Sequence, residues 1–369
     1  MTSGMHRFSL LPLVALVVLG AGEHSKAPAG AAPEPLGGAC VRVALDPRPE
    51  HASGAAWSAD GRELVVPDPL GSGLWRYDLH GKLLGTELRP SQGGRGWLNP
   101  VKISPLPSGF LLSEIRRLIW LDDHLHPLRS LSFPMTPQGR LDTLWSWSVA
   151  GDTFYAIGDI QMGDGTWRFG FVSTSLRDPA QFRLLREIPL TDRQEIDFYP
   201  WQNQQVATVD GVAYFLAMTA HPRILVGSDP PRWLQAFPAG LVRPTLPLSQ
   251  GLRNLAIRSS LYERSAAPVG IYSFAHRLFL LTRRPTANTG TSWMLQQIDP
   301  HTDRLERSFA LPSTADFLAV APGPLAWAII EKGPLNDAAE QDVHHLLLIP
   351  TARLTGKETS STAPIDPCS

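Results

Sequence analysis

The amino-acid sequence predicts an all-β protein, a six-bladed β-propeller whose ring is closed by a strand at residues 41–45 joining the last blade. Three observations predict it. Proline (34) and glycine (31) cut the 369 residues into short segments, because proline fixes φ and glycine permits positive φ. A unit of short apolar strands separated by turns recurs along the chain. The last unit lacks one strand, which residues 41–45 can supply.

The repeat is clearest between residues 54 and 88. Its strands are predicted at 55–58, 63–67, 74–79 and 82–86. The pair Asp60-Gly61 separates the first two, and an Asp-Gly pair between apolar runs is a strong hairpin signal. This unit has the composition expected of one small antiparallel sheet.

The same rhythm returns in five further units. Their strands are predicted at 101–103, 110–112, 118–121 and 128–131; at 145–149, 153–157, 169–172 and 182–185; at 205–208, 212–216, 224–226 and 233–237; at 278–281, 295–299 and 305–309; and at 317–320, 325–330 and 345–349. A single sheet cannot bury both of its faces, so we expect radial stacking, with Trp57, Trp75, Trp120 and Trp327 packed between the sheets.

The two cysteines, Cys40 and Cys368, lie at opposite ends of the predicted propeller domain, residues 40–369. Two cysteines in an exported protein often pair, and this pair requires the chain ends to meet. Pairing of residues 41–45 with the last unit requires the same geometry, so two features support one topology. The alternative is two unpaired thiols in the tails.

The N-terminus predicts export. A weakly basic start, an apolar run at 8–19 and small residues at 20–22 indicate a signal peptide over residues 1–22. A membrane anchor would need about 20 apolar residues, and lipidation at Cys40 is a further alternative. Residues 23–39 are rich in Ala, Pro and Gly and predict a flexible linker. We expect a periplasmic or secreted monomer with no membrane span after signal cleavage.

The first unit also resembles a known repeat. Residues 57–61, 65–68 and 74–82 resemble an NHL-type repeat of six-bladed propellers, with Pro67 as a departure. The resemblance is specific only in residues 54–88, and later units keep the strand rhythm alone. It implies the wider class of TolB-like and YWTD propellers. That class includes hydrolases, lactonases, lyases and binding modules, so the fold does not give the function.

No strong catalytic motif is present in the sequence. It lacks a His-Glu-x-x-His zinc motif, a Gly-x-Ser-x-Gly elbow, a phosphate-binding Gly-x-x-x-x-Gly-Lys loop and a cysteine cluster. A metal at His124 and His126 is an alternative to a polar hairpin turn there. We expect no cofactor. The formal net charge of -1, without a basic run, argues against nucleic acid as a partner.

Aromatic, amide and charged residues gather in the segments that lead into the inner strands. In a propeller these segments meet at one mouth of the central channel, where aromatic faces beside amides and arginines suit a sugar, a peptide or an anion. For each residue the alternative is packing between blades or capping of a strand. The candidate ligand-binding residues are Arg95, Trp97, Asn99, Arg140, Asp142, Trp145, Asp197, Tyr199, Trp201, Asn203, Arg258, Tyr262, Arg264 and Asp316.

These observations predict an exported, non-catalytic binding propeller that recognises a small ligand, glycan, peptide or envelope protein at the channel mouth. The alternative is a hydrolase or lyase with its active site in the central channel. A metal-dependent lactonase of this fold would need Asn99, Asn203, Asp142, Asp197 and Asp316 to converge. A third possibility is a scaffold that binds through its outer rim, marked by an exposed apolar patch.

Overall fold

The structure of the protein is a computed structural model. It describes residues 40–49, 51–69, 73–88, 100–114, 116–180, 182–188, 205–217, 222–238, 241, 265–286, 291–332, 344–356 and 368. Residues 35–369 form one compact unit. The predicted signal peptide (1–22) and linker (23–39) lie outside the described residues.

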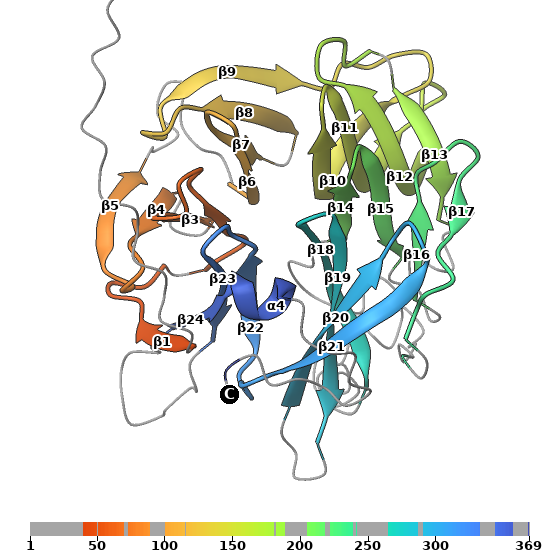
Figure 1. Ribbon diagram of the computed structural model, residues 1–369. Coiled ribbons are helices and arrows are strands. Elements are labelled where there is room, and N and C mark those ends of the chain that lie inside the picture. The colour runs from red at the N-terminus through yellow and green to blue at the C-terminus, as the bar shows by residue number, and fades with distance from the viewer. Residues whose placement is uncertain are drawn as a thin grey trace, which may run out of the picture. The chain divides into compact units, whose positions relative to one another are not determined.

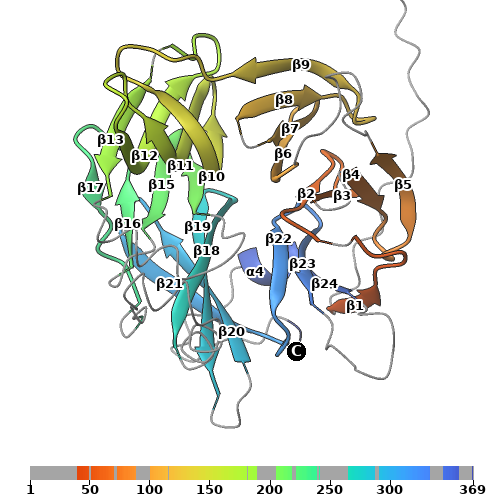
Figure 2. The same cartoon turned by 180° about the vertical axis from the view of Figure 1, so that it is seen from behind.

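The described strands form six four-stranded antiparallel sheets, the blades of a propeller (Figures 1 and 2). From the inner strand outward, blades 1 to 3 are β2 (Ala56–Trp57), β3 (Leu64–Asp68), β4 (Gly73–Tyr77) and β5 (Leu83–Leu88); β6 (Lys102–Leu106), β7 (Gly109–Ser113), β8 (Arg117–Leu121) and β9 (Pro127–Ser132); and β10 (Arg140–Ala150), β11 (Thr153–Gln161), β12 (Trp167–Ser175) and β13 (Arg183–Glu187).

Blades 4 to 6 repeat this order. They are β14 (Val206–Val209), β15 (Val212–Ala217), β16 (Arg223–Val226) and β17 (Arg232–Trp233); β18 (Ala267–Phe274), β19 (Arg277–Pro285), β20 (Thr291–Asp299) and β21 (Arg304–Leu311); and β22 (Phe317–Ala321), β23 (Ala326–Glu331), β24 (His345–Pro350) and β1 (Val41–Ala44). A short helix, α4 (Thr351–Thr355), follows β24.

The ring closes through the N-terminal strand, as the sequence predicts. β1 pairs antiparallel with β24, with Val41 opposite Leu348 and Ala44 opposite His345. In Figure 1 the red β1 lies beside the blue β24, although they come from opposite ends of the chain. Blade 6 is therefore built from both ends, and its outer edge is supplied by residues that precede every other blade.

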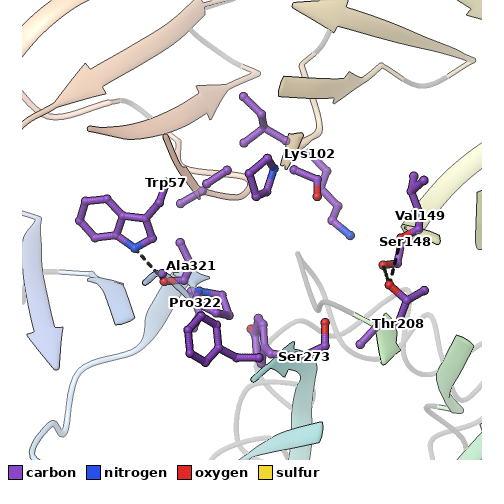
Figure 3. Close-up of a pocket in the computed structure, with 18 of the residues that line it drawn as sticks. Trp57, Lys102, Ser148, Val149, Thr208, Ser273, Ala321 and Pro322 are labelled. Carbon is purple, nitrogen blue, oxygen red and sulfur yellow. Dashed lines mark hydrogen bonds between the residues drawn. The ribbon is translucent and has the colours of Figure 1, made fainter. Parts of the chain in front are cut away.

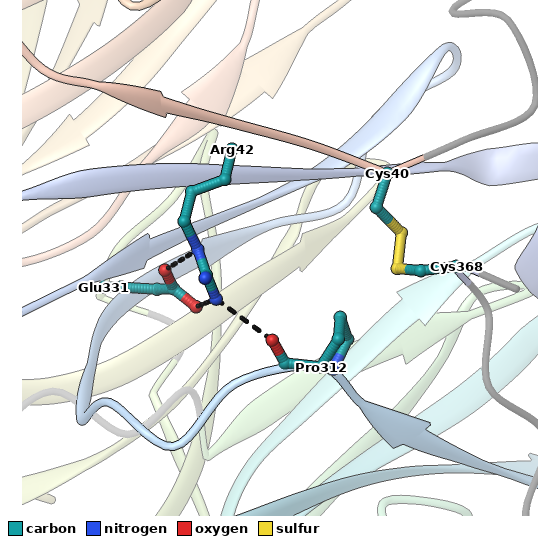
Figure 4. The surroundings of a disulfide bond; sticks show 5 residues. All are labelled: Cys40, Arg42, Pro312, Glu331 and Cys368. Carbon is teal, nitrogen blue, oxygen red and sulfur yellow. Dashed lines mark hydrogen bonds and ion pairs between the residues drawn. A yellow bond between two sulfur atoms is a disulfide. The ribbon is translucent and has the colours of Figure 1, made fainter.

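The predicted disulfide is also present. Cys40, directly before β1, bonds to Cys368 across a sequence separation of 328 residues (Figure 4). Arg42 makes a second tie beside it. Its Nε lies 2.8 Å from Glu331 Oε2 and its Nη2 lies 3.0 Å from Glu331 Oε1, so the guanidinium grips this buried carboxylate with two nitrogens. The same Nη2 donates to the carbonyl of Pro312 at 3.0 Å.

Apolar clusters fill the spaces between neighbouring blades. Side chains alternate along a strand, so one strand serves two neighbours. In β3, Leu64 and Val66 pack toward blade 6, whereas Val65 packs toward blade 2. Trp57 and Trp327 are fully buried, as predicted, and Trp75 and Trp120 are partly buried against the same kind of cluster. The hydrophobic core therefore consists of separate clusters packed between neighbouring blades.

Two strands differ from the sequence prediction. The inner strand of blade 5, β18, was not predicted, because Pro268 and Gly270 obscure its apolar pattern. β10 begins at Arg140, not at residue 145, so residues expected on a loop lie within the strand. The α4 helix was also not predicted, and it packs Leu354 into the cluster between blades 5 and 6.

Replacing Cys368 by Ser should lower the free energy of unfolding, because the unfolded chain then loses a constraint over a very long loop. The expected loss is about 2–4 kcal/mol, measured by urea unfolding. Wild-type protein reduced with dithiothreitol should show the same loss, and the reductant should not change the variant. An unchanged unfolding midpoint in both would show that ring closure does not depend on this bond.

Candidate functional site

A cavity of about 460 Å³ lies where the inner strands of all six blades meet (Figure 3). Small side chains leave this space open, and among them are Ala55, Ala207, Ser273 and Ala321. Most of the lining is apolar, with hydroxyl groups between the apolar patches. Since every blade contributes to the wall, the cavity is a property of the closed ring.

Trp57 forms one wall of the cavity. Its Nε1 donates to the carbonyl of Ala321 at 3.1 Å, which joins blade 1 to blade 6 (Figure 3). Gly323 makes room for the indole, because a Cβ at this position would lie 2.2 Å from Trp57 Cδ1. The local sequence Pro322-Gly323-Pro324 therefore fits the turn after β22 around the tryptophan.

Ser148 on β10 and Thr208 on β14 form a hydroxyl pair on the opposite wall, with their oxygens 3.0 Å apart. Thr208 Oγ1 donates its hydrogen to the carbonyl of Val149 at 3.0 Å. Ser148 must then donate to Thr208, because each hydroxyl carries one hydrogen. The pair presents lone pairs to the cavity and suits a ligand that donates a hydrogen bond.

Lys102, the first residue of β6, is the one charged residue among the described residues that line the cavity. Its side chain extends from blade 2 toward blade 3 (Figure 3). Nζ contacts the carbonyl of Trp147 and lies 4.6 Å from the centroid of that indole. The side chain thus bridges two blades while its amine faces the cavity.

Burial lowers the pKa of Lys102 well below the ordinary value of a lysine. The Trp147 carbonyl and the indole face both favour the ammonium form, but no carboxylate is found in the described part of the lining to compensate the lost hydration. Desolvation therefore outweighs them. Tyr272, also in the lining, is buried, and burial raises the pKa of its phenol.

This lysine gives a pH dependence with a defined sign. Between its depressed folded pKa and the unfolded value of about 10.4, the unfolded state binds more protons, so the free energy of unfolding rises with pH. From neutral pH up to about pH 10, wild-type protein should therefore gain stability over Lys102→Met wherever the pH lies above the folded pKa. Urea unfolding of both proteins across this range measures the difference, and a difference independent of pH would contradict the assignment.

The structure describes only part of the predicted channel-mouth set: Arg140, Asp142, Trp145 and Asp316. The remaining candidates lie outside the described residues: Arg95, Trp97, Asn99, Asp197, Tyr199, Trp201, Asn203, Arg258, Tyr262 and Arg264. Asp316 lies between β21 and β22, with Oδ1 4.0 Å from Arg283 Nε. None of the four described residues lines the cavity.

Asp142 and Trp145 occupy neighbouring irregularities of β10. The buried Asp142 carboxylate forms ion pairs with two arginines. Its Oδ1 lies 3.0 Å from Arg140 Nη2, and its Oδ2 lies 3.2 Å from Nη2 of Arg116 in blade 2. Trp145 is 40% exposed, and its Nε1 donates to Asp159 Oδ2 at 3.0 Å. Trp145 therefore keeps about two fifths of its surface open to solvent, while its ring packs edge-on against Phe169.

Two β-bulges set the direction of the Asp142 and Trp145 side chains. The pairing of β10 with β11 shifts between Leu141 and Thr143 and again between Leu144 and Ser146, so Asp142 and Trp145 are the extra residues. A bulge redirects a side chain out of the regular pleat. Gly158 on β11 accommodates this, because a Cβ there would lie 2.0 Å from the carbonyl oxygen of Thr143.

Replacing Gly158 by Ala should disrupt the bulged pairing and lower the free energy of unfolding by about 1–3 kcal/mol. Hydrogen exchange should show faster exchange of the β10 and β11 amides. Gly85→Ala is the matched control, because a Cβ at Gly85 meets nothing within 4 Å. If both variants behave alike, the close packing on Gly158 does not hold the bulges.

Within the described residues, no group of three or more His, Cys, Asp and Glu side chains could hold a metal ion. His126, weighed as a metal ligand, contacts Asp122 Oδ2 through Nδ1 at 3.2 Å. The Asp122 carboxylate also accepts the backbone N–H of His124 and of His126 at the turn. The geometry is that of a polar hairpin turn, which the sequence favours over a metal site here.

The sequence pattern predicts a site at the starts of the inner strands and does not single out the residues of this cavity. Lys102, Ser148 and Thr208 lie within strands and were counted as strand residues only. A lysine between Val101 and Ile103 in a predicted inner strand was the available signal. An aliphatic residue would be expected at such a position.

Comparison with solved structures supports the fold. A member of the DUF4221 family from Bacteroides vulgatus has 13% identity and a TM-score of 0.55, covering 84% of this chain and 95% of that chain. A gluconolactonase from Xanthomonas campestris has 11% identity and a TM-score of 0.48, covering 84% and 90%. The likeness to the DUF4221 member, at this identity, shows the propeller fold alone.

No family model and no curated protein matches the sequence. The NHL-like resemblance of the first blade therefore stays a prediction. Of the helices in the described residues, none has the length and apolar character needed to cross a membrane.

Proposed function

We propose that this chain is a binding propeller that takes a small molecule into the cavity between its six inner strands. The main observation behind this proposal is the volume of the cavity, about 460 Å³, which lies within the range of small-molecule sites. An apolar wall with a few fixed polar groups is the usual composition of such sites. The sequence predicted a site at the mouth of the channel, whereas the site proposed here lies inside the channel.

The wall chemistry defines the ligand class. Apolar surface from Trp57, Phe274 and Val320 favours a mainly apolar body. The oxygens of Ser148 and Thr208 favour a hydroxyl or another hydrogen-bond donor on one side. Lys102, whose amine contacts the carbonyl of the neighbouring Trp147, favours an electron-rich or carbonyl group close to that donor.

A hydrolase or lyase remains the alternative function. Acid–base catalysis needs a carboxylate, imidazole or similar group within hydrogen-bond reach of the reacting atoms. Among groups of this kind, the described lining holds the Lys102 amine and the Tyr272 phenol but neither a carboxylate nor an imidazole. The buried Asp142 with its arginines lies on β10 outside that lining. This distribution favours binding over turnover.

The compartment is part of the proposal. The Cys40–Cys368 bond is compatible with an oxidising location, because structural disulfides persist in the periplasm and outside the cell. We propose that the protein acts as a periplasmic or secreted binder. Fractionation of cells that express the full chain, with non-reducing electrophoresis of each fraction, tests the location.

Replacing Ser273 by Phe should fill the cavity and abolish ligand binding. In a thermal-shift screen with small aromatic and alicyclic alcohols, a ligand at a hundredfold excess over its dissociation constant stabilises the folded state by about 2.7 kcal/mol. The wild-type shift should disappear in Ser273→Phe. Ser130→Phe, on the exposed outer strand β9, is the control and should keep it.

Two results would overturn the proposal. One is a shift of equal size in Ser273→Phe, which would place the ligand elsewhere. The other is a wild-type protein that none of the alcohols stabilises, which would leave the cavity without a small-molecule role.

A further inference from the structure

The basic residues of this chain are almost all arginines. Of the 33 Lys and Arg residues, the lysines are Lys26, Lys82, Lys102, Lys332 and Lys357. The cavity nevertheless holds a lysine. Arginine stays protonated in proteins, whereas a lysine amine can lose its proton and become a nucleophile. A lysine at position 102 can therefore act as a nucleophile as well as carry a charge, which an arginine could not do.

The contacts of Lys102 leave its amine available. One N–H bond is directed to the Trp147 carbonyl, which fixes Nζ against blade 3. The indole face of Trp147 also lies beside Nζ and excludes water on that side. The side chain is only partly buried and lines the cavity, so a small molecule there can reach Nζ.

We propose that Lys102 captures a small aldehyde or ketone in the cavity as an imine. The inference rests on the proposed function, since it uses the same cavity. The Nζ lone pair attacks the carbonyl carbon, and the carbonyl π bond opens to give a carbinolamine. The nitrogen gives up two protons, the oxygen leaves with them as water, and a carbon–nitrogen double bond forms. No oxidant or reductant is consumed.

Three features support this chemistry. Burial favours the neutral amine, which is the nucleophilic form. The apolar wall limits the water that would hydrolyse an imine. The Ser148–Thr208 pair lies on the same side of the cavity as the Lys102 amine and can accept a hydrogen bond from a hydroxyl on the captured molecule.

The competing explanation is a structural staple, in which Lys102 only joins blade 2 to blade 3 through the Trp147 carbonyl. Reactivity separates the two. An exposed lysine with a pKa of about 10.4 holds less than about 0.1% free amine at neutral pH. Lys82 and Lys332 are exposed in this protein and serve as internal references.

The test is reductive labelling of the intact wild-type protein with benzaldehyde and sodium cyanoborohydride at neutral pH. Peptide mapping by mass spectrometry then gives the rate of benzylation at each lysine. We expect Lys102 to react at least about tenfold faster than Lys82 and Lys332. Benzyl alcohol, which fits the same cavity chemistry but forms no imine, should slow the labelling of Lys102 alone. Lys102→Arg should remove the fast site, and Lys82→Arg should leave it.

The outcomes separate this inference from the proposed function. If benzyl alcohol raises the melting temperature but Lys102 is labelled no faster than the exposed lysines, the residue is a staple and the binding function stands. If benzyl alcohol gives no shift and Lys102 is not labelled, both fail. Fast labelling that benzyl alcohol does not slow places the reactive amine outside the ligand cavity and overturns the inference.

Discussion

The pairing of β1 with β24 is the constraint on which the rest of the ring depends. Without it, blade 6 keeps three strands, and β24 presents an open edge of backbone groups. Three ties of different kinds hold it: the strand pairing, the Cys40–Cys368 bond, and Arg42 gripping Glu331 beyond β24. The Arg42–Glu331 pair also selects the correct register of β1, because a buried carboxylate without its charged partner is costly. Only β1 in the correct register brings that guanidinium there.

Closure also determines what the centre of the ring can be. Large aromatic side chains fill the wedge between sheets, so the inner strands are held apart and small residues near the axis leave a cavity. Polar bonds then join neighbouring inner strands around the wall of this cavity: Trp57 to Ala321, Lys102 to Trp147, and Ser148 to Thr208. The same groups that tie blades together are therefore the polar groups a ligand meets.

The sequence predicted what alternation and turn chemistry encode, namely the six units and their closure. It did not predict β18, where Pro268 and Gly270 break the apolar pattern, or the first half of β10, where two bulges shift Asp142 and Trp145 out of alternation. Lys102 lay in a correctly predicted strand. Its direction toward the axis depends on how six sheets are placed around a ring, and no local pattern in one strand contains that information.

Lys102 is the residue that packing alone explains least well. A neutral glutamine could donate to the Trp147 carbonyl without the cost of desolvating a charge, so a bond between blades 2 and 3 does not require a lysine. The wall around it otherwise follows the rules of a buried strand, with Ile103 and Val149 as neighbours in the lining. Departures from those rules concentrate at functional sites, where a local cost is retained for the chemistry it permits. Burial favours the neutral form of this amine, whose lone pair can form a bond with the carbonyl carbon of a ligand.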